Sequence, residues 1–218
     1  GNGTKWEDKY KDIYNINTQK YNIEQSLARH GITTNEITDI ICTHLHFDHV
    51  GGNTKLESGK IVPTFPNANY WVTKENWELA NHPSQKDSGS FMEENWKVLA
   101  ENQMIKIVNR GEKFIEGVDI YLTYGHTEGL MHPILSDSRN TLFYGADIFP
   151  MAAHIPIPWV MAYDVQPVVT MKEKESLLTK MHNENWILFF EHDPKIQACN
   201  IGWNGKQFYV KNKVFISE

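Results

Sequence analysis

Apolar residues recur at helical spacing in several stretches of the chain, and short apolar runs lie between them. The spacing predicts helices over residues 6–14, 22–30, 73–80, 90–99 and 170–181. Two of these helices are expected to begin at a capping box, Ser90-x-x-Glu93 and Thr170-x-x-Glu173. The apolar runs predict strands over residues 39–42, 69–72, 104–108, 118–124, 142–144 and 186–190.

The order of these elements indicates how the chain is organised. Residues 138–140 are expected to form a turn between two strands, and residues 207–216 a closing pair of strands around Asn212. No fixed repeat or Pro/Gly/Ser-rich linker divides the sequence. We therefore expect residues 1–218 to form a single layered domain that mixes helices and strands.

Composition narrows the class of protein. A chain of 218 residues with 40% hydrophobic and 12% aromatic residues can build a packed core, which excludes a disordered protein. The net charge of −6 gives no support for a nucleic-acid partner, and no apolar run is long enough to cross a membrane. Only Cys42 and Cys199 carry thiols, too few for a disulfide framework, so a cytoplasmic protein is expected.

A cluster of titratable residues follows directly after the apolar strand at 39–42. His44, His46, Asp48 and His49 fall within six residues, and Gly51-Gly52 permits a tight turn after them. One such histidine is usually an ordinary surface or core residue, but four such groups together favour a divalent metal. His44 and His46 can point the same way from an extended segment, and Asp48 and His49 form a second pair where the chain turns. Two pairs suggest two ions, and imidazole with carboxylate suits Zn, Fe, Mn or Co.

Three more candidate ligands stand where predicted strands end: His126, Asp147 and His192. Loops that leave a sheet edge often carry functional residues, although each of these taken alone has an ordinary structural explanation. His132, which follows the His126 turn, is expected at the surface, with a position behind the metal ligands as the alternative.

Together these motifs resemble the metallo-β-lactamase-fold hydrolases, over a span from Gly1 to about Asp193. The resemblance implies an α+β fold, a four-layer αββα sandwich with a dinuclear site at one edge of its two sheets. It also implies the metal ligands: His44, His46 and His126 for one ion, Asp48, His49 and His192 for the other, and Asp147 as the bridge.

Such a site has a defined chemistry. Two cations lower the pKa of a water between them, which supplies hydroxide near neutral pH, and one of them polarises a carbonyl or phosphoryl oxygen. Asp48 is expected to orient the water and to pass its proton to the leaving group, so Asp48 and Asp147 are the predicted catalytic carboxylates.

Departures from other branches narrow the resemblance to the N-acyl homoserine lactonases and methyl parathion hydrolase-like enzymes. Asp147 stands where many true β-lactamases have Cys, and His46 stands where the di-iron redox branch has Glu. A glyoxalase II-like thioesterase is disfavoured because the segment after His192 is short and reads as strand. That enzyme and a non-catalytic ligand-binding member of the fold remain the alternatives.

The segment from 148 to 164 is apolar and contains three prolines, so it is not expected to form a helix. It is expected either to line a pocket for an acyl or aryl group or to be an ordinary connection over the core. Phe47, His154, Trp159 and Tyr163 are the predicted substrate-binding residues. Pro150 stands where small lactonases have a Tyr.

The start of the chain differs from the start of family members. Family members have N-terminal strands and an Asp-Thr-Gly turn before the segment that matches Gly1-Asn2-Gly3. The resemblance therefore implies that the first sheet is incomplete in this chain. The expected partner is a small-molecule substrate, and exposed aromatic residues make a homodimer possible.

Overall fold

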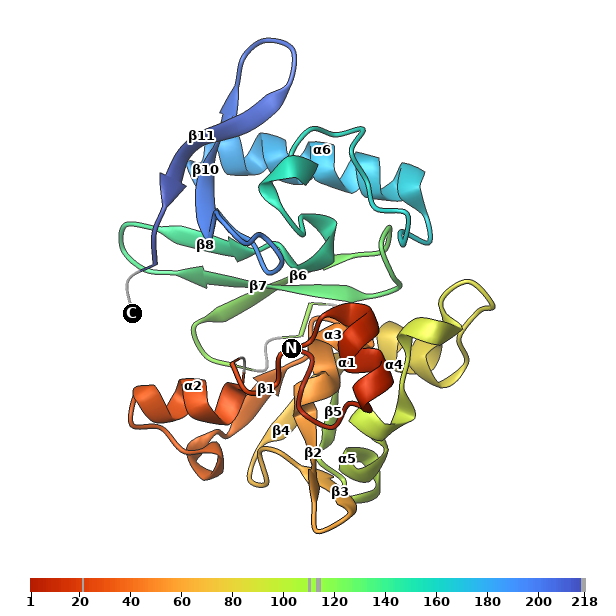
Figure 1. The fold of residues 1–218 in the computed structure, drawn as a ribbon. Helices are drawn as coiled ribbons and strands as arrows, with labels where there is room; N and C mark the ends of the chain where they lie inside the picture. The colour runs from red at the N-terminus through yellow and green to blue at the C-terminus, as the bar shows by residue number, and fades with distance from the viewer. Residues whose placement is uncertain (21, 110, 113–114, 217–218) are drawn as a thin grey trace. The chain divides into compact units, whose positions relative to one another are not determined.

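The computed structural model describes residues 1–20, 22–109, 111–112 and 115–216 (Figure 1). The chain divides into two compact units, Gly1–Val108 and Asn109–Glu218, and each has its own hydrophobic core.

The first unit combines a parallel sheet, a hairpin and short helices. Its sheet has the order β1-β4-β5 with parallel neighbours, and β2 and β3 form the hairpin. The strands are β1 (Asp39–Ile41), β2 (Thr54–Glu57), β3 (Lys60–Pro63), β4 (Asn69–Thr73) and β5 (Ile105–Val108). The helices are α1 (Asp8–Tyr14), α2 (Ile23–Arg29), α3 (Phe47–Val50), α4 (Lys74–Asn81) and α5 (Lys97–Glu101).

Local hydrogen bonds explain where the predicted helices of this unit begin. The side chain of Asn22 accepts from the first backbone N–H groups of α2, and the Thr73 hydroxyl accepts from the N–H of Asn76 in α4. The predictions of α1, α2, α4, β1, β4 and β5 are confirmed.

The predicted helix over 90–99 is wrong in its first half. Phe91 and Met92 have extended backbones, and Phe91 forms an isolated antiparallel bridge with His46. A strand-like pairing at this point is incompatible with a helix that begins at Ser90. The segment instead contains 3₁₀ turns at Ser88–Ser90 and Glu93–Asn95, and the α-helix begins only at Lys97.

The second unit is built on one sheet of order β11-β10-β9-β8-β7-β6. Its neighbours are antiparallel except β8 and β9, which are parallel and connected through α6. The elements are β6 (Val118–Thr123), β7 (Leu130–Ser136), β8 (Thr141–Tyr144), α6 (Pro167–Asn183), β9 (Ile187–Phe189), β10 (Ala198–Trp203) and β11 (Phe208–Val214).

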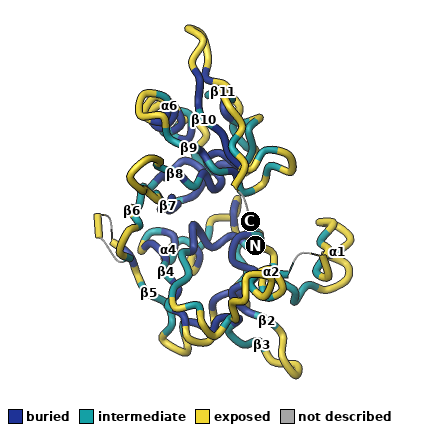
Figure 2. Tube along the Cα trace, turned by 90° about the vertical axis from the view of Figure 1, so that its left-hand side faces the viewer, coloured by how far each residue is buried: buried dark blue, intermediate teal, exposed yellow. Residues whose placement is uncertain are grey.

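Two strands of this sheet differ from the prediction. β7 lies between β6 and β8 but was not predicted, because Pro133 and His132 interrupt its apolar pattern. Pro133 is tolerated since pairing with β8 begins only at Ile134. The predicted pair of strands around Asn212 is wrong: β11 runs through this residue and bulges beside it, and the exposed turn lies before Phe208 (Figure 2).

The helix α6 begins three residues earlier than predicted. Pro167 occupies the first helical turn, where its missing N–H is not needed, so Thr170 lies inside the helix and its predicted capping box is wrong. The Glu173 carboxylate accepts instead from the N–H groups of Tyr124 and Gly125, at 2.7 and 3.0 Å. This contact ties α6 to the loop that carries His126.

The core of the second unit lies between α6 and the sheet. Leu177, Leu178 and Met181 of α6 pack with Phe143 of β8 and Leu188 of β9. The described helices of the chain are all too short or too polar to cross a membrane.

Candidate metal centre

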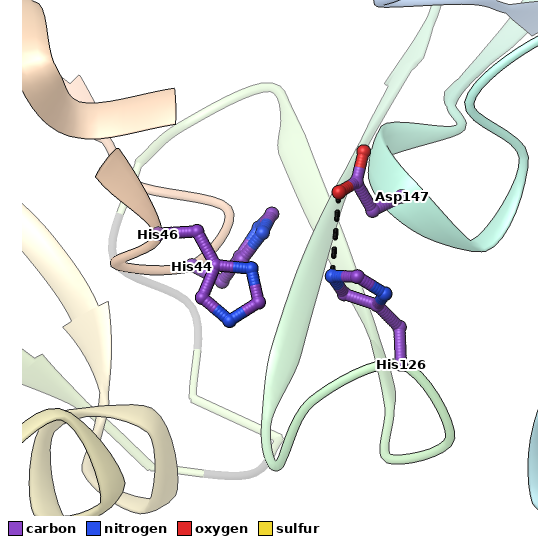
Figure 3. Close-up of side chains that lie close together, drawn as sticks. All are labelled: His44, His46, His126 and Asp147. Atoms are coloured by element: carbon purple, nitrogen blue, oxygen red, sulfur yellow. Dashed lines mark ion pairs between the residues drawn. The ribbon is translucent and has the colours of Figure 1, made fainter. Parts of the chain in front are cut away.

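The histidine motif lies in the first unit, between β1 and α3. Leu45 is fully buried, and its N–H donates to the Asn76 side chain at 2.8 Å. His46 has an extended backbone, and the side chains of His44 and His46 lie close together (Figure 3). Their ring centroids lie 4.4 Å apart and each ring offers a nitrogen within 4.8 Å of the other's. The predicted pairing of these two side chains is therefore present.

Asp48 and His49 follow in the first turn of α3. The Asp48 carboxylate lies 3.5 Å from the Nε2 atom of His49, whose ring stands 4.0 Å from that of His44. The turn after them depends on glycine, because a Cβ atom on Gly51 would clash with the backbone of Asn2. The Lys5 ammonium donates to the Gly51 carbonyl at 2.7 Å. All four residues of the motif thus lie within one short segment, which is hydrogen-bonded to Asn76 at Leu45 and to Lys5 at Gly51.

His126 lies in the second unit, in the loop after β6. Its Nδ1 atom donates to the Asp164 carboxylate at 2.9 Å, and its Nε2 atom lies 3.3 Å from Asp147 (Figure 3). The side chains of His126 and Asp164 are each only 1% exposed. The buried Asp164 carboxylate fixes the orientation of the ring, whose Nε2 atom faces Asp147.

Asp147 lies in the 3₁₀ turn Ala146–Ile148, directly after β8. One of its oxygens approaches Nε2 of His126, and the other lies 3.1 Å from Nε2 of His192. His192 follows β9, and its backbone N–H donates to the Pro150 carbonyl. The two oxygens of one carboxylate thus face two different imidazoles, as a bridging ligand requires.

Two carboxylates near these ligands were missed at the sequence level. Asp164 is separated from His126 by 38 residues, and no local pattern links them. Glu191 directly precedes His192, and ligand atoms of Asp147, Glu191 and His192 all lie within 4.8 Å of one another. Its position beside a predicted ligand was the only available signal.

His132 is buried rather than at the surface, so that prediction is wrong. Its Nε2 atom and the Thr123 hydroxyl are 2.8 Å apart, and its Nδ1 atom is hydrogen-bonded to the Tyr144 carbonyl at 3.0 Å. The ring stacks on Phe143 with centroids 5.0 Å apart. Burial lowers the pKa of His132 to about 4, so the ring is neutral near neutral pH.

The predicted substrate-binding residues occupy different environments. Phe47 packs edge-on against Trp6, with ring centroids 5.4 Å apart, and also contacts Tyr14. Trp159 and Tyr163 are 64% and 74% exposed. Residues 148–164, all of them described, contain 3₁₀ turns but no α-helix, as predicted.

His154 lies in one of those 3₁₀ turns, Ala152–His154. Burial and the nearby Lys174 ammonium lower the pKa of His154, which keeps the ring neutral near neutral pH. A role for these four residues in substrate binding stays a prediction.

The chemistry of the donor set fits divalent metal ions. Imidazole nitrogens and carboxylate oxygens are ligands that Zn, Fe, Mn and Co accept. The Thr43 hydroxyl is hydrogen-bonded to Nδ1 of His44 at 3.2 Å, as Asp164 is to Nδ1 of His126. Metal-binding histidines usually hold their second ring nitrogen in this way. Both units therefore carry His and Asp groups able to hold metal ions.

Comparison with known proteins is consistent with this chemistry. A family model described as the metallo-beta-lactamase superfamily matches residues 6–192. An N-acyl homoserine lactonase of Bacillus sp is 30% identical over 123 residues, which are 56% of this chain and 42% of the relative. The matched stretch thus spans less than half of that relative.

Solved structures give the same fold. A probable metal-dependent hydrolase from Staphylococcus aureus aligns with a TM-score of 0.84 and 22% identity, covering 99% of this chain and 77% of the other. A dizinc quorum-quenching lactonase with a bound product aligns with a TM-score of 0.74 and 20% identity, covering 89% and 70%. These likenesses confirm the predicted fold class.

Proposed function

Because the chain belongs to the metallo-beta-lactamase superfamily, we propose that it is a dinuclear metal-dependent hydrolase that opens a lactone or cleaves an ester or phosphotriester bond. The observation that carries this proposal is the carboxylate of Asp147, whose two oxygens face the imidazoles of His126 and His192. The lactonase relative and the dizinc lactonase neighbour support the same class of reaction.

The proposed ligands are the seven residues that the resemblance to the family implies. One ion would be held by His44, His46 and His126, the other by Asp48, His49 and His192, with Asp147 shared between them. Zinc is the first choice because the neighbouring lactonase is a dizinc protein, and Fe, Mn and Co are compatible with the same ligands. When bound, such ions activate a water molecule and polarise the acceptor oxygen of the substrate.

The protein's own side chains supply orientation and proton transfer. Asp164 holds Nδ1 of His126 and thereby sets the direction of its Nε2 atom. Asp48 is partly exposed at the start of α3, where its carboxylate can orient the attacking water and deliver a proton to the leaving group. The carboxylate would accept a hydrogen bond from the water, take up its proton and pass that proton to the leaving group.

The predicted substrate-binding residues suit a substrate with an acyl or aryl group. Phe47, inside the histidine motif, is continuous with the aromatic rings of Trp6 and Tyr14 from the start of the chain. Trp159 and Tyr163 present further aromatic surface on the second unit, and His154 offers a neutral hydrogen-bonding group. We propose that these residues contact the non-reacting part of the substrate.

The test combines metal content with turnover. Protein loaded with Zn, Mn or Fe would be assayed on an acyl lactone, an aryl phosphotriester and a thioester. We expect about two ions per chain, turnover of the lactone or phosphotriester, and loss of activity by about 10² or more in Asp147→Ala. Asp12→Ala, which changes an exposed carboxylate of α1, is the control and should behave as wild type.

Each alternative gives a different result. Turnover of the thioester alone would identify a glyoxalase II-like enzyme. Tight binding of metal without turnover of any substrate would indicate a ligand-binding protein of the same fold. One ion per chain, or full activity in Asp147→Ala, would refute the dinuclear site.

A further inference from the structure

Lys174 is a buried cation that has no role in the proposed reaction. It lies on the inward face of α6, at the helical spacing of Thr170, Leu177 and Leu178, a position that the pattern of the sequence assigns to an apolar side chain. The residue has no exposed surface. An ammonium group in such a place destabilises the fold unless its three N–H donors are satisfied.

The donors of Lys174 all go to one short stretch of backbone. Nζ donates to the carbonyl oxygens of Pro156, Ile157 and Trp159, at 3.0, 3.3 and 2.7 Å. The Pro156 carbonyl also accepts from the N–H of Trp159, at 3.0 Å. The ammonium thus closes a turn whose prolines lack N–H groups, and it fixes the backbone that presents the exposed Trp159 side chain.

The two ends of the same loop are attached beside predicted metal ligands. Near its start, the Pro150 carbonyl accepts from the N–H of His192, and Ala152 donates to the Asp193 carboxylate at 3.0 Å. At its end, Asp164 accepts from His126. Lys174 therefore fixes the backbone in the middle of the loop by hydrogen bonds, next to Ile155, whose side chain is buried in the core of the unit.

We propose that Lys174 is a specificity-determining positioning residue, whose ammonium holds the 156–159 turn so that Trp159 stands where it selects the acyl or aryl group of the substrate. The inference rests on the proposed function. It assigns Lys174 no contact with the reacting atoms, so its loss should affect the binding of the substrate's apolar part and leave the chemical step intact.

The main test is a comparison of variants on acyl lactones of short and long chain. Lys174→Met keeps the length of the side chain and removes its donors, whereas Lys174→Arg keeps a cation with several N–H groups. In Lys174→Met we expect KM to rise about tenfold for the long-chain lactone, with little change for the short one and kcat within about twofold. Lys174→Arg should recover most of the long-chain preference. Lys172→Met, at an exposed position of the same helix, is the matched control and should leave both constants unchanged.

A measurement without substrate separates this inference from the proposed function. Hydrogen exchange of the 155–163 peptide reports on the turn itself, because the Trp159 N–H is bonded within it. Loss of the bonds to a charged group should speed this exchange about tenfold in Lys174→Met, and Lys172→Met should leave it unchanged. If wild type hydrolyses none of the substrates, the proposed function fails, and the exchange data alone decide whether Lys174 holds the turn.

The pH dependence gives a further readout if Lys174→Met does not fold. Burial lowers the pKa of Lys174 to about 8, while the negative charge of Asp164 opposes that shift. Asp164 and His154 are the titratable neighbours, and the lowered pKa of His154 leaves that ring already neutral at this pH. Long-chain KM should therefore rise above about pH 8 in wild type and stay flat in Lys174→Arg.

The inference is overturned by any of three results. These are unchanged exchange of the 155–163 peptide in Lys174→Met, an equal change of KM for short and long chains, and a fall in kcat with KM unaltered. Identical pH profiles of KM for wild type and Lys174→Arg would count against it in the same way.

Discussion

The burial of His132 predicts a specific loss of stability in acid. The hydrogen bonds fit a neutral ring: Nδ1–H donates to the Tyr144 carbonyl and Nε2 accepts from the Thr123 hydroxyl. A proton on Nε2 would need the hydroxyl to turn and would place a charge in the core beside Phe143. This explains why burial is the main cause that lowers the pKa of His132 to about 4 from 6.5.

The sign and size of the effect follow from linkage. Between pH 6.5 and 4 the unfolded chain binds a proton at His132 that the folded protein does not bind, so the free energy of unfolding falls as the pH is lowered through this range. Each unit of pKa difference corresponds to about 1.4 kcal/mol, so His132 alone should cost the fold about 2 kcal/mol between pH 7 and pH 4.5.

The assay is urea unfolding of the metal-free protein across this pH range. His132→Gln retains an amide that can donate and accept, and it cannot titrate here. Its stability at pH 7 should be lower than that of wild type, but its stability should fall less between pH 7 and 4.5, by about 2 kcal/mol. His30→Gln, at an exposed position, should follow the wild-type curve. Parallel curves for wild type and His132→Gln would refute the reasoning.

Two further predictions follow from buried contacts. Asp164→Asn removes the charge that orients His126, so affinity for metal should fall by about 10- to 100-fold in competition with a chelator; an affinity equal to that of wild type would exclude this role. Leu178→Ala creates a cavity under α6 and should lower the free energy of unfolding by about 2–5 kcal/mol in urea. Val168→Ala, exposed on the same helix, should change it by less than about 0.5 kcal/mol, and similar losses in both would argue against the packing seen here.

The sequence was most informative where the chemistry is local. His44, His46, Asp48 and His49 are neighbours in the chain, so their grouping needs no knowledge of tertiary structure. His126 was found because it follows a strand with a clear apolar pattern. The family and fold class could therefore be predicted, and the comparisons confirm both.

The errors in the predicted elements arise where contacts between distant residues determine the local structure. The Ser90 capping box has the right residues, but pairing of Phe91 with His46 keeps the backbone extended. Glu173 accepts from the Tyr124 and Gly125 backbones instead of capping its own helix. Each motif offers hydrogen-bonding groups that a distant backbone can also use, and the sequence does not show which partner wins.

Contacts between distant residues also hold the predicted metal ligands in place. Asp164 reaches His126 from 38 residues away, and Asp147 meets His192 only because β8 and β9 are neighbours in the sheet. These bonds fix the directions of the imidazoles within the second unit itself. Folding therefore orients these side chains before any metal binds. A site whose side chains are oriented in advance binds its ion more tightly. For this reason the substitutions most damaging to metal binding should include Asp164, which the donor pattern of the sequence does not reveal.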